Sequence, residues 1–287
     1  MQRATRILGL STAVLLWGLG CSLTSLDYLS SERDKGATSD AGPDAPPWKP
    51  PAKAAWQYQL DGPIDTAVDA EVFVVDLFDT PSATVNELHG KGRKVAAWFS
   101  AGTLEAWRSD GASFPSAAQG NPIATSSDEK WLDIRAGAVR EGMKTRLKEA
   151  QLRGFDAVVG ANLDSYTTGD SGFPLTLQDA SGYAAELSAA SHALGLAFAL
   201  ENAAAVAQQT SSTIDFAVVV DCLRASGECG DYDFVRKSGK PVLNAEAFDT
   251  VGEAQSQQAA LCPKATGKGL SSILKTTSFD AWRLPCP

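Results

Sequence analysis

The sequence has little that could hold a metal ion. It contains only two histidines, His89 and His192, and both lie in segments with a helical pattern. Its five cysteines include no Cys-x-x-Cys pair, a spacing that many structural zinc sites share. We therefore expect neither a metal nor another cofactor.

Positive charge is also scarce. The chain has 25 Lys and Arg against 34 Asp and Glu, a formal net charge of −9. Removing an N-terminal segment that carries Arg3 and Arg6 leaves 23 basic against 34 acidic residues, or −11. Nucleic-acid binding depends on neutralising phosphates with Lys and Arg, so this balance argues against a nucleic-acid partner. An acidic surface suits a cationic ligand, although many exported proteins are acidic without one.

The sequence lacks an apolar run long enough for a permanent membrane span. The N-terminal run Ile7–Leu19 is too short to cross a bilayer and follows two arginines, which predicts an export signal over residues 1–20. Leu16–Cys21 resembles a bacterial lipoprotein cleavage site, with Gly18 where leucine is usual. We expect Cys21 to carry lipid and to anchor the chain to a membrane of the cell envelope. An ordinary signal with an unlipidated Cys21 would instead give a secreted protein.

Apolar residues are few in the next segment as well. Residues 21–53 are rich in Ser, Asp, Pro and Gly, which predicts a disordered tether that extends away from the membrane. Residues 54–287, about 230 in number, are enough for one sizeable core. We expect them to form a single domain and the protein to be a monomer.

The domain alternates apolar runs with helical patterns, which is typical of a parallel α/β fold. Eight strands in about 230 residues favour a (β/α)8 TIM barrel over an open sheet. The expected strands are Gln57–Leu60, Val72–Phe78, Lys94–Ser100, Ala157–Val159, Leu196–Leu200, Phe216–Val220, Pro241–Ala245 and Ser271–Lys275. The expected helices are Ser82–Gly90, Ser127–Arg153, Leu177–Leu194, Ala203–Gln209, Tyr232–Ser238 and Val251–Leu261.

Polar residues gather where the expected strands end, which is the face of such a barrel that carries the site. They are Gln59, Asp76, Asp79, Ser100, Asn162, Asp164, Glu201, Asn202, Asp221 and Glu246. The connection Ala101–Ser126 is much longer than the others and carries Glu105, Trp107, Arg108 and Phe114. Long loops in compact domains are often lids or binding loops. We expect a sugar-binding crevice in which Trp107 or Arg108 lies over the strand-end residues. Each polar residue taken alone could be a strand-end cap.

The four cysteines beyond Cys21 are an even number in an exported chain. Cys222 and Cys229 lie seven residues apart around a glycine-containing turn and could pair, which would leave Cys262 with Cys286. Four cysteines allow three pairings, and spacing alone leaves the choice open.

Nine segments together resemble glycoside hydrolase family 114, the endo-α-1,4-polygalactosaminidases. The resemblance covers the chain from residue 56 onward and implies a (β/α)8 barrel that acts on a polysaccharide. It also supports the Cys222–Cys229 pair, because the family carries cysteines at both places. The segments are WQYQLDGPID, VVDLFDT, KVAAWFSAGTLEAWRSD, EKWLDIR, GFDAVVGANLDSY, LTLQDASGY, DFAVVVDC, EC and GKPVLNAEAF.

The chain departs from the family at its catalytic carboxylates. The resemblance places the expected nucleophile at Ala161 and the expected general acid at Val220, and a family lysine corresponds to Glu201. Asp221 is one residue from the expected acid, but successive strand residues face opposite ways, so it should point out of the crevice. The catalytic residues are therefore unknown from the sequence.

Three interpretations follow. The one we favour is a catalytically impaired relative that binds an amino-sugar polysaccharide, for which the negative charge of Glu201 would favour a cationic ligand. Another is an active endo-glycosidase with relocated carboxylates, in which Glu201 pairs with Asp76 or Asp164. The third is a structural lipoprotein whose barrel has no specific ligand.

Overall fold

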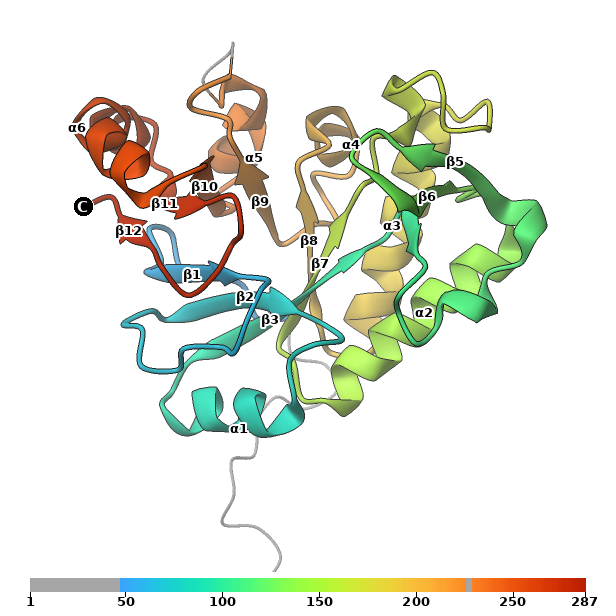
Figure 1. Ribbon diagram of the computed structural model, residues 1–287, viewed down its shortest axis with the longest axis horizontal. Helices are drawn as coiled ribbons and strands as arrows, with labels where there is room; N and C mark the ends of the chain where they lie inside the picture. The colour runs from blue at the N-terminus through green and yellow to red at the C-terminus, as the bar shows by residue number, and fades with distance from the viewer. Residues whose placement is uncertain (1–46, 226–228) are drawn as a thin grey trace, which may run out of the picture. The chain divides into compact units, whose positions relative to one another are not determined.

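A computed structural model describes residues 47–225 and 229–287 of the chain (Figure 1). The expected signal peptide, Cys21 and most of the expected tether lie outside these ranges. Within them, no helix is both long enough and apolar enough to cross a membrane.

Eight parallel strands form the centre of the fold. In chain order they are β1 (Trp56–Gln59), β2 (Val72–Asp76), β3 (Lys94–Ser100), β7 (Ala157–Ala161), β8 (Ala197–Glu201), β9 (Phe216–Val220), β10 (Val242–Phe248) and β11 (Ser271–Thr276). Each strand pairs in parallel with the next in this order. The expected (β/α)8 architecture is therefore confirmed, and every predicted strand lies within three residues of the observed bounds at each end.

Helices connect the strands and cover the outside of the sheet (Figure 1). Capping residues mark where some of these helices begin. The helix α3, for example, starts with a capping box in which the side chains of Thr176 and Asp179 each accept a hydrogen bond from the other residue's backbone amide. Pro263 does not end the last helix, which continues past the predicted stop at Leu261. The helices are α1 (Ser82–Gly90), α2 (Gly137–Leu152), α3 (Leu177–Ala193), α4 (Ala204–Gln209), α5 (Asp233–Lys237) and α6 (Val251–Gly267).

The long connection after β3 is not a simple loop. It folds into a small antiparallel sheet of β4 (Thr103–Glu105), β5 (Gln119–Ile123) and β6 (Ser126–Leu132). The prediction of a helix from Ser127 was therefore wrong for its first ten residues, and α2 begins only at Gly137. The charged sequence of β6 is held extended by its neighbours, because pairing partners decide strand formation more than intrinsic preference does.

Two apolar layers stabilise the barrel. Alternate strand residues such as Trp56, Tyr58 and Val74 fill its interior, whereas Phe73 and Val75 face the helices outside. The same alternation decides which residues face the crevice where the strands end. Because Val159, Ala199 and Val218 point inward, so do the residues two positions further on in β7, β8 and β9. Those residues are Ala161, Glu201 and Val220.

Side chains join the first and last parallel strands. Trp56 Nε1 donates to the Ser271 carbonyl across 2.9 Å. The ammonium group of the fully buried Lys275 donates to Gln57 Oε1 at 3.3 Å, to the Asp280 carbonyl at 2.6 Å and to the Trp282 carbonyl. Burial lowers the pKa of Lys275 to about 7. Beyond β11, the two-residue strand β12 (Leu284–Pro285) pairs antiparallel with it.

Both expected disulfides are confirmed. Cys222 and Cys229 are bonded, with Cα atoms 4.8 Å apart, and Cys262 and Cys286 are bonded at 5.0 Å. The second bridge ties α6 to the C-terminal tail.

Candidate functional site

Glu201 ends β8 and is the centre of the crevice at the C-terminal end of the strands. Its Oε2 atom accepts hydrogen bonds from the Tyr58 hydroxyl and, at 2.6 Å, from Trp98 Nε1. Burial raises the pKa of the Glu201 carboxyl, the two hydrogen bonds oppose this shift, and the charge of Asp164 adds to it. Glu201 is thus a partly exposed carboxyl whose pKa lies above the usual value for a glutamate.

The two expected catalytic positions flank Glu201. Gly160 of β7 pairs with Leu200 of β8, and Glu201 itself pairs with Val218 of β9. Ala161 and Val220 therefore face the crevice on either side of Glu201. Neither side chain can transfer a proton or attack a sugar carbon.

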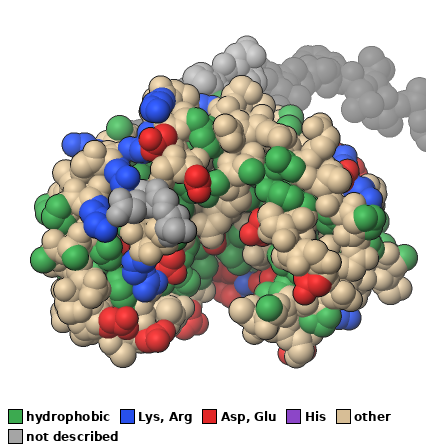
Figure 2. Space-filling view, turned by 90° about the horizontal axis from the view of Figure 1, so that it is seen from above, with side chains coloured by type: hydrophobic (Ala, Val, Ile, Leu, Met, Phe, Trp, Pro, Cys, Tyr) green, Lys and Arg blue, Asp and Glu red, His purple; other side chains and the backbone are tan. Residues whose placement is uncertain are grey.

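The floor around Glu201 is apolar. Four partly exposed side chains pack on the barrel interior and leave the rest of their surface to solvent. They are Leu60, Trp98, Val220 and Phe279. Figure 2 shows a hollowed surface around which hydrophobic and acidic side chains gather.

Asp164 supplies a second carboxylate beside Glu201. It follows β7 at the start of the short helix η3 (Ser165–Thr167), and within the described residues its carboxylate makes no hydrogen bond. Its charge raises the pKa of Glu201 and contributes to the raised pKa values of Tyr166 and Tyr232. These groups therefore lie within electrostatic range of one another, and Asp164 is available to a ligand.

Asn162 joins the small antiparallel sheet to the crevice. Its Nδ2 donates to Ser100 Oγ at 2.9 Å and to Glu129 Oε1 at 3.3 Å, and its backbone has a positive φ of 60°. Thr103 Oγ1 donates to the same Glu129 oxygen at 2.5 Å. Glu129 is not among the predicted site residues, although it lies in the EKWLDIR segment of the family resemblance.

Arg108 is held by three carboxylates and does not reach into the crevice as a free cation. Its guanidinium donates to Asp76 Oδ2 at 2.5 Å, to Asp79 Oδ2 at 2.7 Å and to Glu105 Oε1 at 3.1 Å. Burial raises the pKa values of Asp76 and Glu105 despite this positive neighbour. The cluster fixes the connection after β3 to the end of β2 and leaves the adjacent Trp107 57% exposed.

Gln59 and Asn202 bond to backbone rather than face the crevice. Gln59 Nε2 donates to the carbonyls of Asp61 and Pro63, at 3.1 and 2.9 Å, and its Oε1 accepts from the Asp65 amide. It thereby shapes the loop after β1, which borders a cavity of about 460 Å³. Asn202 Oδ1 accepts from the Val220 amide at 2.9 Å.

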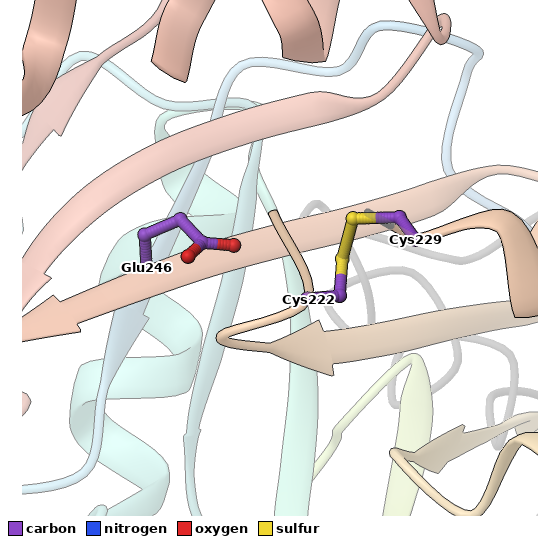
Figure 3. A group of neighbouring side chains, drawn as sticks. All are labelled: Cys222, Cys229 and Glu246. Carbon is purple, nitrogen blue, oxygen red and sulfur yellow. A yellow bond between two sulfur atoms is a disulfide. The ribbon is translucent and has the colours of Figure 1, made fainter. Parts of the chain in front are cut away.

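Glu246 lies on the outer face of β10, away from the crevice. Its Oε1 accepts from the Leu223 amide at 2.8 Å and from Asn244 Nδ2 at 2.9 Å. Figure 3 shows its carboxylate directed toward the Cys222–Cys229 bridge, and one carboxylate oxygen and the two sulfur atoms lie within 4.8 Å of one another. Because both sulfurs are in the disulfide, this group offers no thiolate to a metal ion.

The predicted site residues therefore fall into three groups in the structure. Glu201, Asp164 and Asn162 gather at the crevice, and Asp76, Asp79 and Arg108 form an ion cluster beside it. Gln59, Asn202 and Glu246 support loops. Asp221 does the same, since its Oδ1 accepts from the Ala247 amide at 2.8 Å.

Comparisons with known proteins agree with this arrangement. The model of glycoside-hydrolase family GH114 matches residues 37–287. One similar solved structure is the crystal structure of Aspergillus fumigatus Ega3 in complex with galactosamine. Its sequence is 31% identical to this one, the match spans 88% of this chain and 100% of the Ega3 chain, and the two structures superpose with a TM-score of 0.78. The glycoside hydrolase domain of PelA from Pseudomonas aeruginosa has the same fold, with 16% sequence identity and a TM-score of 0.62. The match spans 80% of this chain and 96% of the PelA domain. No curated protein matches the sequence significantly.

Proposed function

Because the chain belongs to glycoside hydrolase family GH114, we propose that it binds an amino-sugar polysaccharide at the cell envelope without hydrolysing it. The observation that carries this proposal is the pair Ala161 and Val220. Both face the crevice from the strands that flank Glu201, where the family resemblance places the nucleophile and the general acid. Hydrolysis of a glycoside needs two carboxyl groups across the scissile bond, and neither residue supplies one.

The ligand class rests on similarity and on charge. The related Ega3 structure holds galactosamine. The carboxylate of Asp164, which has no hydrogen-bond partner among the described residues, and the net charge of −9 attract cationic sugars. The exposed ring of Trp107 offers a surface on which a sugar ring can stack.

One observation favours an active glycosidase instead. Burial raises the pKa of Glu201, which is the direction that suits a general acid, and Asp164 is a nearby carboxylate without a hydrogen-bond partner among the described residues. Asp76 is less suited than Asp164 to be the second carboxylate, because the Asp76 carboxylate is paired with Arg108. In this second candidate function, Glu201 protonates the leaving glycosidic oxygen, and Asp164 attacks or stabilises the sugar carbon from the opposite side of the scissile bond.

An α-1,4-linked galactosamine oligosaccharide distinguishes the two functions. We expect calorimetry to show binding that weakens as salt is raised, because added salt screens the acidic surface. Product analysis by mass spectrometry should show no cleavage. Glu141→Gln, a change of an exposed carboxylate on α2, is the matched control and should leave binding unaltered. Turnover that disappears in Glu201→Gln would establish the glycosidase and refute the binding protein.

We also propose that lipid on Cys21 holds the protein at a membrane. The supporting features are the apolar run Ile7–Leu19 and the cleavage-site pattern that ends at Cys21. A Cys21→Ser variant should move from the membrane fraction to the soluble fraction when exporting cells are lysed and fractionated. An unchanged distribution would contradict the anchor.

A further inference from the structure

The disulfide that follows β9 has a buried carboxylate as its neighbour. Glu246 extends from the outer face of β10 toward the bridge between Cys222 and Cys229 (Figure 3). All three residues are buried, and Glu246 is fully so. Within the part of the chain that the structure describes, no other set of three His, Cys, Asp or Glu side chains is arranged so that it could hold a metal ion.

The two oxygens of Glu246 have different partners. Oε1 accepts hydrogen bonds from the Leu223 amide at 2.8 Å and from Asn244 Nδ2 at 2.9 Å. Oε2 is buried and accepts none. Arg224 Nε lies 3.4 Å from Oε2 as an ion pair, but this guanidinium donates to Asp221 Oδ1 at 2.6 Å instead. Native proteins rarely leave such an oxygen without a partner, and a bound ion is one way of supplying it.

Asn244 orients both the sulfur of Cys222 and the carboxylate. Its Oδ1 accepts from Ser272 Oγ at 2.8 Å, which leaves Nδ2 to face the other way. Nδ2 lies 3.2 Å from Cys222 Sγ and 2.9 Å from Glu246 Oε1. Side chains that hydrogen-bond to metal ligands fix their orientation and raise metal affinity. Such support is therefore in place for two of the three side chains.

We propose that Cys222, Cys229 and Glu246 form a zinc site when this disulfide is reduced. A dithiol supplies the two electrons and the two protons. Its own sulfurs join in a disulfide, the bond between the two cysteine sulfurs breaks, and both cysteines become thiols. Zn²⁺ then displaces the two thiol protons into solvent and binds both thiolates and Glu246 Oε2. The fourth position of a tetrahedral ion stays open.

Zinc suits this donor set better than calcium or magnesium does. Calcium and magnesium prefer oxygen ligands, whereas zinc is bound by thiolates and carboxylates alike. Zinc also undergoes no redox change of its own. The ion and the disulfide use the same two sulfur atoms, so a chain has one or the other but never both.

Zinc titration of the oxidised and the reduced protein tests the site. The starting protein carries Cys21→Ser, which removes the fifth cysteine, and is reduced under argon with a phosphine that takes up oxygen from water as the disulfides break. Competition with a chromophoric chelator should show tight zinc binding by the reduced protein and none by the oxidised protein. Zinc should also raise the midpoint of thermal unfolding of the reduced protein, because a ligand of the folded chain stabilises it.

Three variants assign the ligands. Cys222→Ser should lose the tight binding. Glu246→Gln keeps the size of the side chain without its charge and should weaken binding by about tenfold or more, as loss of an outer partner of a ligand already does. The double variant Cys262→Ser, Cys286→Ser is the matched control. It removes the other disulfide, which belongs to no such group of ligand atoms among the described residues, and should bind zinc as the starting protein does.

Several outcomes would overturn the inference. Equal zinc binding by the oxidised and the reduced protein would mean that the two thiols form no site. Equal binding by Glu246→Gln and the starting protein would mean that the buried carboxylate is not a ligand. If reduction alone unfolds the chain, added zinc should restore the folded state, and a chain that stays unfolded would contradict the site as well.

Discussion

The Ala161→Asp, Val220→Glu double variant is expected to cleave galactosamine oligosaccharides at least about 100-fold faster than the unaltered chain. Both new carboxyl groups would enter the crevice, because positions 161 and 220 face inward at the ends of β7 and β9. One could then protonate the leaving oxygen while the other attacks or stabilises the sugar carbon. The measurement is reducing-end release over time.

Glu201 should limit the gain in cleavage rate, because it lies between the two altered positions. A third carboxyl there would repel the new pair and raise their pKa values. The family resemblance places lysine at this point, so adding Glu201→Lys to the double variant should increase the rate further. Ala161→Asn with Val220→Gln adds the same bulk without acid or base and serves as the control. Equal rates in the two double variants would show that the crevice is no longer a hydrolase scaffold.

Arg146→Met is expected to lower the free energy of unfolding by about 1.5–3 kcal/mol, the usual contribution of hydrogen bonds to a charged group, because Arg146 is buried while its partner Asp110 keeps 24% of its side chain exposed. The guanidinium is 1% exposed and binds both Asp110 oxygens, at 2.7 and 3.0 Å. It also donates to the Ser100 carbonyl at 2.8 Å and lies over the rings of Phe78 and Phe114. One side chain thus joins α2, β3 and the connection after β3. Urea denaturation measures the loss.

Lys144→Met, also on α2, is the matched control for this loss. Its ammonium pairs with Glu141 and Glu186, but the side chain is 32% exposed. Exposed ion pairs contribute little, because water screens them, so Lys144→Met should cost much less than Arg146→Met. Similar losses in the two variants would mean that the buried ion pair does not hold the connection in place.

The strands were predictable because burial on both faces leaves a readable pattern. Val72–Val75 and Phe216–Val220 are continuous apolar runs, as buried parallel strands are. The small antiparallel sheet was not predictable in the same way. Residues Ser126–Leu132 are largely polar and become a strand only through pairing with β4 and β5.

The crevice was predictable only in part. Alternation along β8 and β9 correctly places Glu201 and Val220 inside and Asp221 outside. The same rule, applied to β1 and β10, would have assigned Gln59 and Glu246 to the outer face. The partners of Glu201 had no local signal, because Tyr58 lies 143 residues away in the chain and Trp98 lies 103 away.

The seam between β1 and β11 makes the crevice depend on both ends of the domain. Trp56 meets Ser271 across 215 residues, so contacts of the longest range close the barrel. Phe279, whose ring lies 4.9 Å from that of Tyr58, comes from the segment that follows β11. Because Tyr58 and Phe279 come from opposite ends of the domain, the floor of the crevice is complete only when the whole domain is present.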